Sequence, residues 1–283
     1  MGTKQKKSLI KTPFFKGMLV IVLLTLTVIP LFAQGNLLIY PKRLVFEGRT
    51  KIKKLVLSNI GKDTAVYKIS FLEYKMEKSG AFKIITTPEP GQRFASSKIR
   101  FYPRRVTLAP RESQTVKVQL SSRQQLTEGE YRSHLYFRAV KEKVALGEIE
   151  KTQDSTMSVS LTPVFGLAIP CIVRKGTDNT TVSIAKLEFI KSKNAYRALK
   201  FHMIRSGNMS VYGDFTINYI ATDNTVYEVA KIKGVGIYTP GTLREMKIRL
   251  KNIENRSFEG GFFKLVFTKN ESEEILTEAI LKL

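Results

Sequence analysis

Cysteine, histidine and tryptophan are scarce in this sequence. Among its 283 residues there are one cysteine, Cys171, two histidines and no tryptophan. No disulfide can form within the chain, so its folded parts must be held together by apolar burial. Cys171 falls in a series of alternating apolar residues, where a small packed side chain is expected.

Few residues are available for a catalytic or metal site. His134 and His202 both fall in alternating, strand-like segments, where we expect a side chain that faces solvent or has a hydrogen-bonding partner. The sequence has no G-x-S-x-G elbow, no phosphate-binding loop and no cysteine pair. It therefore predicts no catalytic residues, no cofactor and no metal, in a protein that is not an enzyme.

An uncharged apolar run stands near the beginning of the chain. Gly17–Ala33 have the sequence GMLVIVLLTLTVIPLFA and follow five lysines, a pattern typical of a secretory signal peptide. The run is shorter than the about 20 residues that a membrane-spanning helix needs, and it contains Pro30, so a permanent membrane anchor is the weaker alternative. We predict a signal peptide over residues 1–33, cleaved after Ala33, and an exported protein.

Acidic residues are also few. The chain has 24 Asp and Glu against 47 Lys and Arg, a formal net charge of +23. Five of the lysines lie in the predicted signal peptide, and without them the remaining 250 residues carry +18. Such an excess predicts an acidic partner, either nucleic acid, an anionic envelope surface or an acidic client protein. Export disfavours nucleic acid and leaves contact with an anionic envelope surface open.

Alternation of apolar and polar residues runs through most of the remaining sequence. The segments KKLVLSN, QTVKVQL, YRSHLYFRAV and EMKIRL are typical of short strands, and Gly, Asn, Pro or Ser separate them. Helical periodicity is scarce. This spacing of strands and turn signals predicts an all-β chain built from β-sandwiches.

A weak internal repeat divides the chain in two. Leu108–Leu120 have the sequence LAPRESQTVKVQL and Tyr238–Leu250 have YTPGTLREMKIRL, with the same spacing from a proline to the end of a strand. A charged turn that contains Gly and Asn, Arg174–Thr180, lies between the two halves. We therefore predict two tandem sandwich domains, 34–175 and 176–283, with a cleft between them that favours binding.

The segment Met157–Val173, MSVSLTPVFGLAIPCIV, is long for one strand. Most of its odd-numbered positions are apolar, and most even-numbered ones are small or hydroxylated. One interpretation is a core strand that continues into the linker. Pro163 does not fit this interpretation, because proline in sheets is confined to edges and bulges. An apolar edge strand is an aggregation hazard unless it pairs with another chain, so we predict that part of this strand serves a partner.

The sequence resembles the periplasmic pilus (fimbrial) chaperones of the chaperone-usher pathway, the PapD-like family. The matching pieces are, in order, RLVFEG at Arg43–Gly48, LVLSNIG, FYPRRVTLAPRESQTVKV at Phe101–Val118, EYRSHLYF and GLAIPCIVRKG. The resemblance implies two tandem immunoglobulin-like β-sandwich domains, a periplasmic location and no catalysis. It also implies exported pilin-like subunits that lack their last strand as clients, and an outer-membrane usher as a further partner.

The resemblance also implies client-binding residues. In the family, alternating apolar residues of the exit strand of the first domain fill the open groove of the client; here they correspond to Met157, Val159, Leu161, Phe165, Leu167 and Ile169. In the family, an Arg on the first strand and a Lys on the exit strand also hold the terminal carboxylate of the client. Arg43 matches the Arg, but Pro170 stands in place of the Lys, and Arg104 or Arg105 is a candidate substitute.

Arg174 resembles an inter-domain arginine that closes the exit strand in the family. Its usual acidic partners are not in place in the sequence. Arg132 occupies one of the two positions, and Phe258, beside Glu259, occupies the other. The sequence therefore leaves Arg174 without an expected carboxylate partner.

Two functions are compatible with these observations. The first is a periplasmic chaperone-like protein that donates an edge strand to exported pilin-type subunits and so assists their folding and surface assembly. The alternative is a structural or scaffold β-sandwich protein of the cell envelope, whose basic surface lies on anionic glycolipid. The first function predicts a client complex that an acidic residue at Leu161 or Phe165 disrupts.

Overall fold

The computed structural model describes residues 37–121, 125–140, 165–191, 197–253 and 258–283. Most of these residues lie in strands or in the turns that join them, and the one helical element described is a single 3-10 turn, η1 (Ser96–Lys98). Within the described ranges no helix has the length and apolar character needed to cross a membrane. The predicted signal peptide, residues 1–33, lies outside the described residues.

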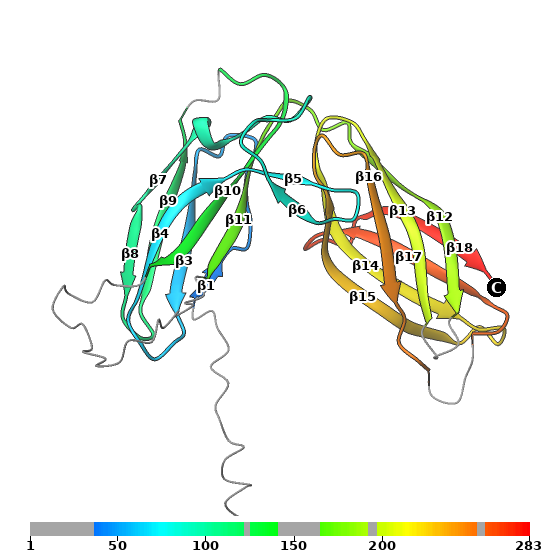
Figure 1. The fold of residues 1–283 in the computed structure, drawn as a ribbon. Helices are drawn as coiled ribbons and strands as arrows, with labels where there is room; N and C mark the ends of the chain where they lie inside the picture. The colour runs from blue at the N-terminus through cyan, green and yellow to red at the C-terminus, as the bar shows by residue number, and fades with distance from the viewer. Residues whose placement is uncertain (1–36, 122–124, 141–164, 192–196, 254–257) are drawn as a thin grey trace, which may run out of the picture. The chain divides into compact units, whose positions relative to one another are not determined.

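Two sheets form an N-terminal sandwich (Figure 1). The first has the strand order β1 (Leu37–Tyr40), β3 (Ile52–Asn59), β9 (Ser113–Leu120) and β7 (Ile99–Tyr102). The second has the order β2 (Leu44–Phe46), β11 (Gly166–Lys175), β10 (Gly129–Val140), β4 (Ala65–Leu72) and β8 (Arg105–Leu108). Alternation turns one side of each strand inward, so that Leu55 and Leu57 of β3 and Val116 and Val118 of β9 are fully buried.

Two further sheets form a C-terminal sandwich. One has the order β12 (Thr181–Lys191), β13 (Arg197–Ser206) and β16 (Leu243–Arg249). The other has the order β15 (Val226–Ile237), β14 (Val211–Ile220), β17 (Phe262–Lys269) and β18 (Ile275–Lys282). The core between them is rich in aromatic residues, and the rings of Phe215 and Phe267 stack with centroids 4.6 Å apart.

These sheets confirm the prediction of an all-β chain with two tandem β-sandwiches. The segment KKLVLSN lies in β3, QTVKVQL in β9, YRSHLYFRAV in β10 and most of EMKIRL in β16. The strands of the N-terminal sheets extend as far as Lys175, and those of the C-terminal sheets begin at Thr181. The domain limits 34–175 and 176–283 stay a prediction.

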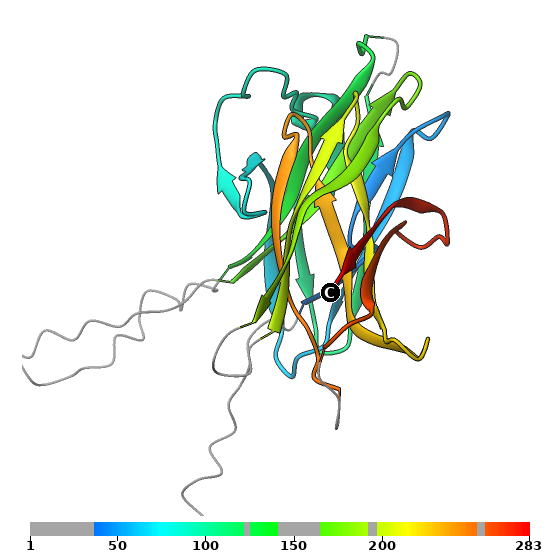
Figure 2. The same cartoon turned by 90° about the vertical axis from the view of Figure 1, so that its right-hand side faces the viewer.

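A hairpin of β5 (Tyr74–Met76) and β6 (Phe82–Ile84) stands apart from the two N-terminal sheets (Figure 1 and Figure 2). The backbone N–H of Glu245, in β16, donates to the carbonyl of Lys78 in the hairpin turn at 2.7 Å. Gly80 in the same turn has a φ of +86°, and a Cβ there would lie 2.7 Å from the guanidinium of Arg244. The positive φ at this position favours glycine, and the hydrogen bond from Glu245 connects the hairpin turn to the C-terminal sandwich.

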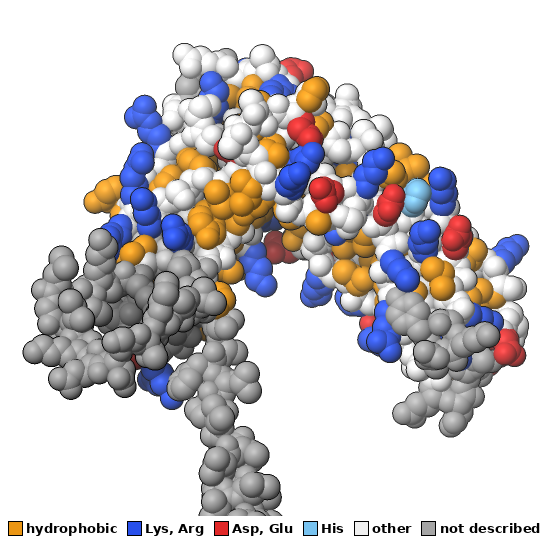
Figure 3. Space-filling view, viewed as in Figure 1, with side chains coloured by type: hydrophobic (Ala, Val, Ile, Leu, Met, Phe, Trp, Pro, Cys, Tyr) orange, Lys and Arg blue, Asp and Glu red, His pale blue; other side chains and the backbone are white. Residues whose placement is uncertain are grey.

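Three cations stand in one cross-strand row of the second N-terminal sheet. Arg138 of β10 lies opposite Lys68 of β4, and Lys68 lies opposite Arg105 of β8. All three residues are exposed, while the neighbours of Lys68, Tyr67 and Ile69, are buried on the other side of the strand. Lys and Arg side chains are also frequent on the face of the molecule that Figure 3 shows. Like charges directly opposite one another destabilise a sheet.

We expect Lys68→Glu to raise the free energy of unfolding by about 1 kcal/mol, because it turns two like-charge pairs into opposite-charge pairs that each contribute roughly 0.2–1 kcal/mol. Urea unfolding at low salt measures the change. The matched control is Lys231→Glu, which changes the net charge equally at an exposed position opposite Thr216 in the β14–β15 pair. Equal effects of the two substitutions, or a gain that persists in high salt, would contradict the expectation.

Candidate strand-pairing edge and cleft

Part of β11 has one unpaired edge. On one side β11 pairs with β10 along its whole length, from Gly166 opposite Arg138 to Lys175 opposite Gly129. On the other side it pairs with β2 only over Cys171–Val173. Among the described residues, no strand pairs with Gly166–Pro170 on that side. The backbone groups there are in a position to accept an added strand.

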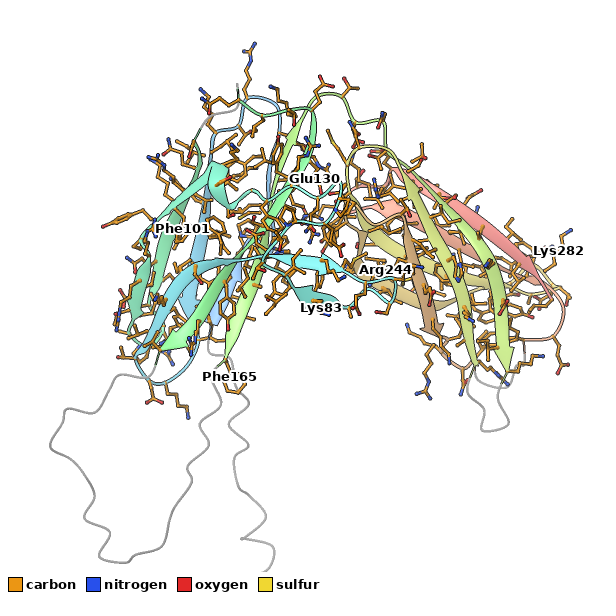
Figure 4. All side chains as sticks on the ribbon, turned by 45° about the horizontal axis from the view of Figure 1, so that its top comes forward. Lys83, Phe101, Glu130, Phe165, Arg244 and Lys282 are labelled. Atoms are coloured by element: carbon orange, nitrogen blue, oxygen red, sulfur yellow. The ribbon has the colours of Figure 1, made fainter. Side chains whose placement is uncertain are left out.

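The apolar row along β11 leaves the core within this unpaired stretch, between Ile169 and Leu167. Cys171 and Val173 are fully buried and Ile169 is 8% exposed, but Leu167 is 43% exposed and Phe165 is 41% exposed. Figure 4 shows Phe165 at the beginning of β11. Alternation therefore continues past the region that the protein's own core covers, and it leaves two large apolar side chains beside the unpaired edge.

Only part of the set of predicted client-binding residues lies in the described ranges of the structure. Phe165 and Leu167 lie exposed as the edge-strand hypothesis requires, and the side chain of Ile169 packs in the N-terminal core opposite Leu135. Alternation in the sequence did not reveal where the core ends, so it did not separate Ile169 from the other two. Met157, Val159 and Leu161 lie outside the described residues.

A cavity of about 340 Å³ lies beside this edge. Ala168 and Pro170 of β11 line it, together with Arg43, which precedes β2. The guanidinium carbon of Arg43 lies 3.8 Å from the centre of the Tyr212 ring, and its Nε has no hydrogen-bonding partner among the described residues. An arginine that lines a cavity suits a carboxylate ligand.

The second cation of this cavity is Lys42. Lys42 lines the cavity next to Arg43, whereas neither Arg104 nor Arg105 is among the lining residues. The Arg104 guanidinium lies 5.6 Å from the centre of the Phe101 ring, and Arg105 is exposed on β8. The structure therefore does not bring the two predicted substitutes to Arg43. The adjacent Lys42 and Arg43 in the sequence were the available signal for the pair.

His134 forms part of the wall of the cavity and is 5% exposed. Its ring makes edge-to-face contacts with Tyr74 and Phe82, at centroid distances of 4.8 and 5.7 Å. Burial, and then the charge of Arg132, lower the pKa of His134 to about 3, so the imidazole is neutral at physiological pH. The prediction of a solvent-facing or hydrogen-bonded histidine is wrong for its Nδ1, which is buried without a partner among the described residues.

Arg174 has a carboxylate partner that the sequence comparison missed. Its Nε donates to Glu130 at 3.2 Å and its Nη2 donates to the carbonyl of Ser210 at 2.7 Å. Glu130 lies directly opposite Arg174 in the β10–β11 pair, two residues before the position that Arg132 occupies. Glu130 therefore supplies the carboxylate that the two compared positions, Arg132 and Phe258, do not, and the inter-domain role of Arg174 stays a proposal.

Glu130 is a buried acceptor for several donors. The backbone N–H of Ser210 donates to it at 3.0 Å, and the Ser210 hydroxyl donates to its other carboxylate oxygen. The side chain of Glu130 has no exposed surface. A buried carboxylate is stable in such a position only when its oxygens are hydrogen-bonded, and here both are.

The described residues show no group of three His, Cys, Asp or Glu side chains that could hold a metal ion. Cys171 is fully buried, and burial raises the pKa of its thiol to about 12. The thiol is therefore a packed core group and not a reactive one, as the alternating sequence predicted.

No protein-family model matches the sequence, and a comparison with curated proteins finds no match. Solved structures to which the chain is similar include several chaperones. The class 5 fimbriae chaperone CfaA is 15% identical, with a TM-score of 0.43 over 87% of this chain and 98% of CfaA. The YadV chaperone is 11% identical, with a TM-score of 0.44 over 88% of this chain and 100% of YadV.

A third similar structure is the SafA pilin of Salmonella enterica in complex with the SafB chaperone. It is 9% identical, with a TM-score of 0.41 over 89% of this chain and 98% of the matched chain. Identities and TM-scores of this size do not assign a function. We therefore base the function on the residues and contacts of this chain.

Proposed function

We propose that the protein is a periplasmic chaperone-like protein that binds exported, β-rich pilin-type subunits by adding part of β11 to the client's sheet. The observation that supports this function most directly is the unpaired edge at Gly166–Pro170, with Phe165 and Leu167 exposed beside it. A pilin is the bound protein in the SafA–SafB complex, and a tip adhesin is the bound protein in a second similar structure. The proposed activity is binding and involves no chemical reaction.

The edge can supply both register and affinity. Backbone groups of Gly166–Pro170 would form the ladder with the client strand, which fixes the register. Phe165 and Leu167 would enter the apolar groove that a missing strand leaves in the client. Each such side chain contributes roughly 1.5–3 kcal/mol when it is buried, so the two together contribute about 3–6 kcal/mol in addition to the hydrogen bonds of the ladder.

The cavity would hold the end of the client chain. Arg43 and Lys42 line it, and a carboxylate between them would accept charge-assisted hydrogen bonds. This arrangement takes both cations from one segment before β2, whereas the family that the sequence resembles places the second on the exit strand, where Pro170 stands here. The signal peptide over residues 1–33 would export the protein to the periplasm.

We expect Leu167→Asp and Phe165→Asp each to weaken client binding by about 10- to 150-fold, the equivalent of one buried apolar side chain. The assay is co-expression with candidate pilin-type subunits, followed by titration of the purified one-to-one complex. The matched control is Ile280→Asp, which adds the same charge at an exposed apolar position of β18 in the C-terminal sandwich.

Client binding that Leu167→Asp and Phe165→Asp leave unchanged would refute strand donation from β11. Retention of the protein in membrane fractions after a high-salt wash, without exchange of a bound subunit, would instead favour the envelope scaffold. The two outcomes separate the functions, because a scaffold has no need of an unpaired apolar edge.

A further inference from the structure

The cavity beside β11 has aromatic walls. Tyr74 and Phe82 of the β5–β6 hairpin line it, and so do Tyr212 and Tyr238 of the C-terminal sandwich. The Phe82 ring lies 5.8 Å from the rings of both Tyr74 and Tyr238. Phe82 is 47% exposed, so this aromatic cluster is open on one side. A partly open cluster of rings is a favourable place for a further apolar or aromatic side chain.

The charged residues that line the cavity are all positive. Lys42 and Arg43 are its cations, and none of its described lining residues is Asp or Glu. His134 adds an uncharged surface, because burial lowers the pKa of its imidazole to about 3. The cavity therefore offers a positive end for an anion and an uncharged aromatic end, but no described carboxylate to receive a basic side chain.

We propose that this cavity also selects the last side chain of the client: beside the carboxylate site that the proposed function assigns to Lys42 and Arg43, the walls formed by Tyr74, Phe82 and Tyr238 receive an aromatic or large aliphatic side chain. The inference rests on the proposed function, since it assumes that a client chain ends in the cavity. A volume of about 340 Å³ falls in the range of small ligand sites and accommodates a phenyl or isobutyl group with its carboxylate. A terminal Lys or Arg would lose hydration there without gaining a partner.

The test measures the binding of short labelled peptides to the full mature protein by fluorescence anisotropy. One peptide ends in Phe with a free carboxylate, the second ends in Gly, and the third ends in Phe amide. We expect the Phe acid to bind at least about tenfold more tightly than the Gly acid, which is the effect of burying one large apolar side chain. We expect the Phe amide to bind more weakly than the Phe acid, because it lacks the charge that Arg43 and Lys42 would hold.

Substitutions test the aromatic walls and the cationic end of the cavity separately. Phe82→Ala should reduce the ratio of Phe-acid to Gly-acid affinity to within about threefold, whereas Arg43→Gln should weaken both acids and leave the ratio unchanged. Ile84→Ala is the matched control, since Ile84 is exposed on the same hairpin but does not line the cavity. Equal affinity for the Phe and Gly acids, or no binding of either, overturns the inference. Client capture that still depends on Leu167 would then leave the proposed function standing.

Discussion

Glu130→Ala is expected to lower the free energy of unfolding by about 3–5 kcal/mol, the usual cost of breaking a buried ion pair by removing one partner. The Glu130 side chain is fully buried and accepts hydrogen bonds from Arg174 and from the backbone and hydroxyl of Ser210. Its removal would leave these donors without their acceptor. The matched control is Glu128→Ala, an exposed carboxylate two residues earlier, which should change the stability by less than about 0.5 kcal/mol. Urea unfolding measures both.

The same substitution should alter cooperativity. Glu130 belongs to β10 of the N-terminal sandwich, and Ser210 directly precedes β14 of the C-terminal sandwich. Their hydrogen bonds therefore connect the two, and we expect the unfolding curve of Glu130→Ala to separate into two transitions. Adding Arg174→Met to Glu130→Ala should recover part of the lost stability, because it removes a largely buried cation that has lost its buried carboxylate partner. Similar losses for Glu130→Ala and Glu128→Ala would show that the hydrogen bonds contribute little.

The strands could be predicted from the sequence because the pattern that identifies a strand is local. Alternation with a period of two needs only a few consecutive residues, and it correctly placed Leu55 and Leu57 inward on β3. The same local signal predicted the apolar row of β11 and the packed Cys171. It could not show that Ile169 lies within the core and Leu167 beyond it, because both lie outside the Cys171–Val173 pairing with β2 and the limit depends on which residues from distant parts of the chain pack against the row.

The contacts of the candidate site depend on pairing over long distances. Glu130 meets Arg174 because the register of β10 and β11 places them opposite each other, and a shift by one residue would bring Tyr131 there instead. His134 is buried because Tyr74 and Phe82, from a hairpin far away in the sequence, pack against it. A single sequence determines neither the register of two strands nor the position of a hairpin. The sequence analysis therefore missed the contact between Glu130 and Arg174 and the burial of His134. The role of Arg43 was suggested by its place in a family-like segment and still awaits the binding experiments.

The environment of His134 makes the stability depend on pH. The imidazole is packed against the rings of Tyr74 and Phe82 and is close to the charge of Arg132. Burial and this charge lower its pKa to about 3 in the folded protein, against about 6.5 in the unfolded chain. The unfolded state therefore binds a proton more readily than the folded state. The stability contributed by the neutral histidine is fully present above pH 6.5 and is lost progressively as the pH falls towards 3.

We expect the free energy of unfolding to fall by about 2 kcal/mol between pH 7.5 and pH 5, since each pH unit below 6.5 removes about 1.4 kcal/mol. Burial raises the pKa of Glu73, so the folded state binds a proton at Glu73 more readily than the unfolded state does. This contribution to stability has the opposite sign to that of His134, and the slope of stability against pH should therefore flatten at lower pH.

His134→Phe keeps an aromatic ring in the cluster and should abolish the slope between pH 7.5 and pH 5. His202→Gln, at the other histidine of the chain, should retain it. Urea unfolding at a series of pH values measures all three proteins, and an unchanged slope in His134→Phe would show that His134 is accessible to protons in the folded state.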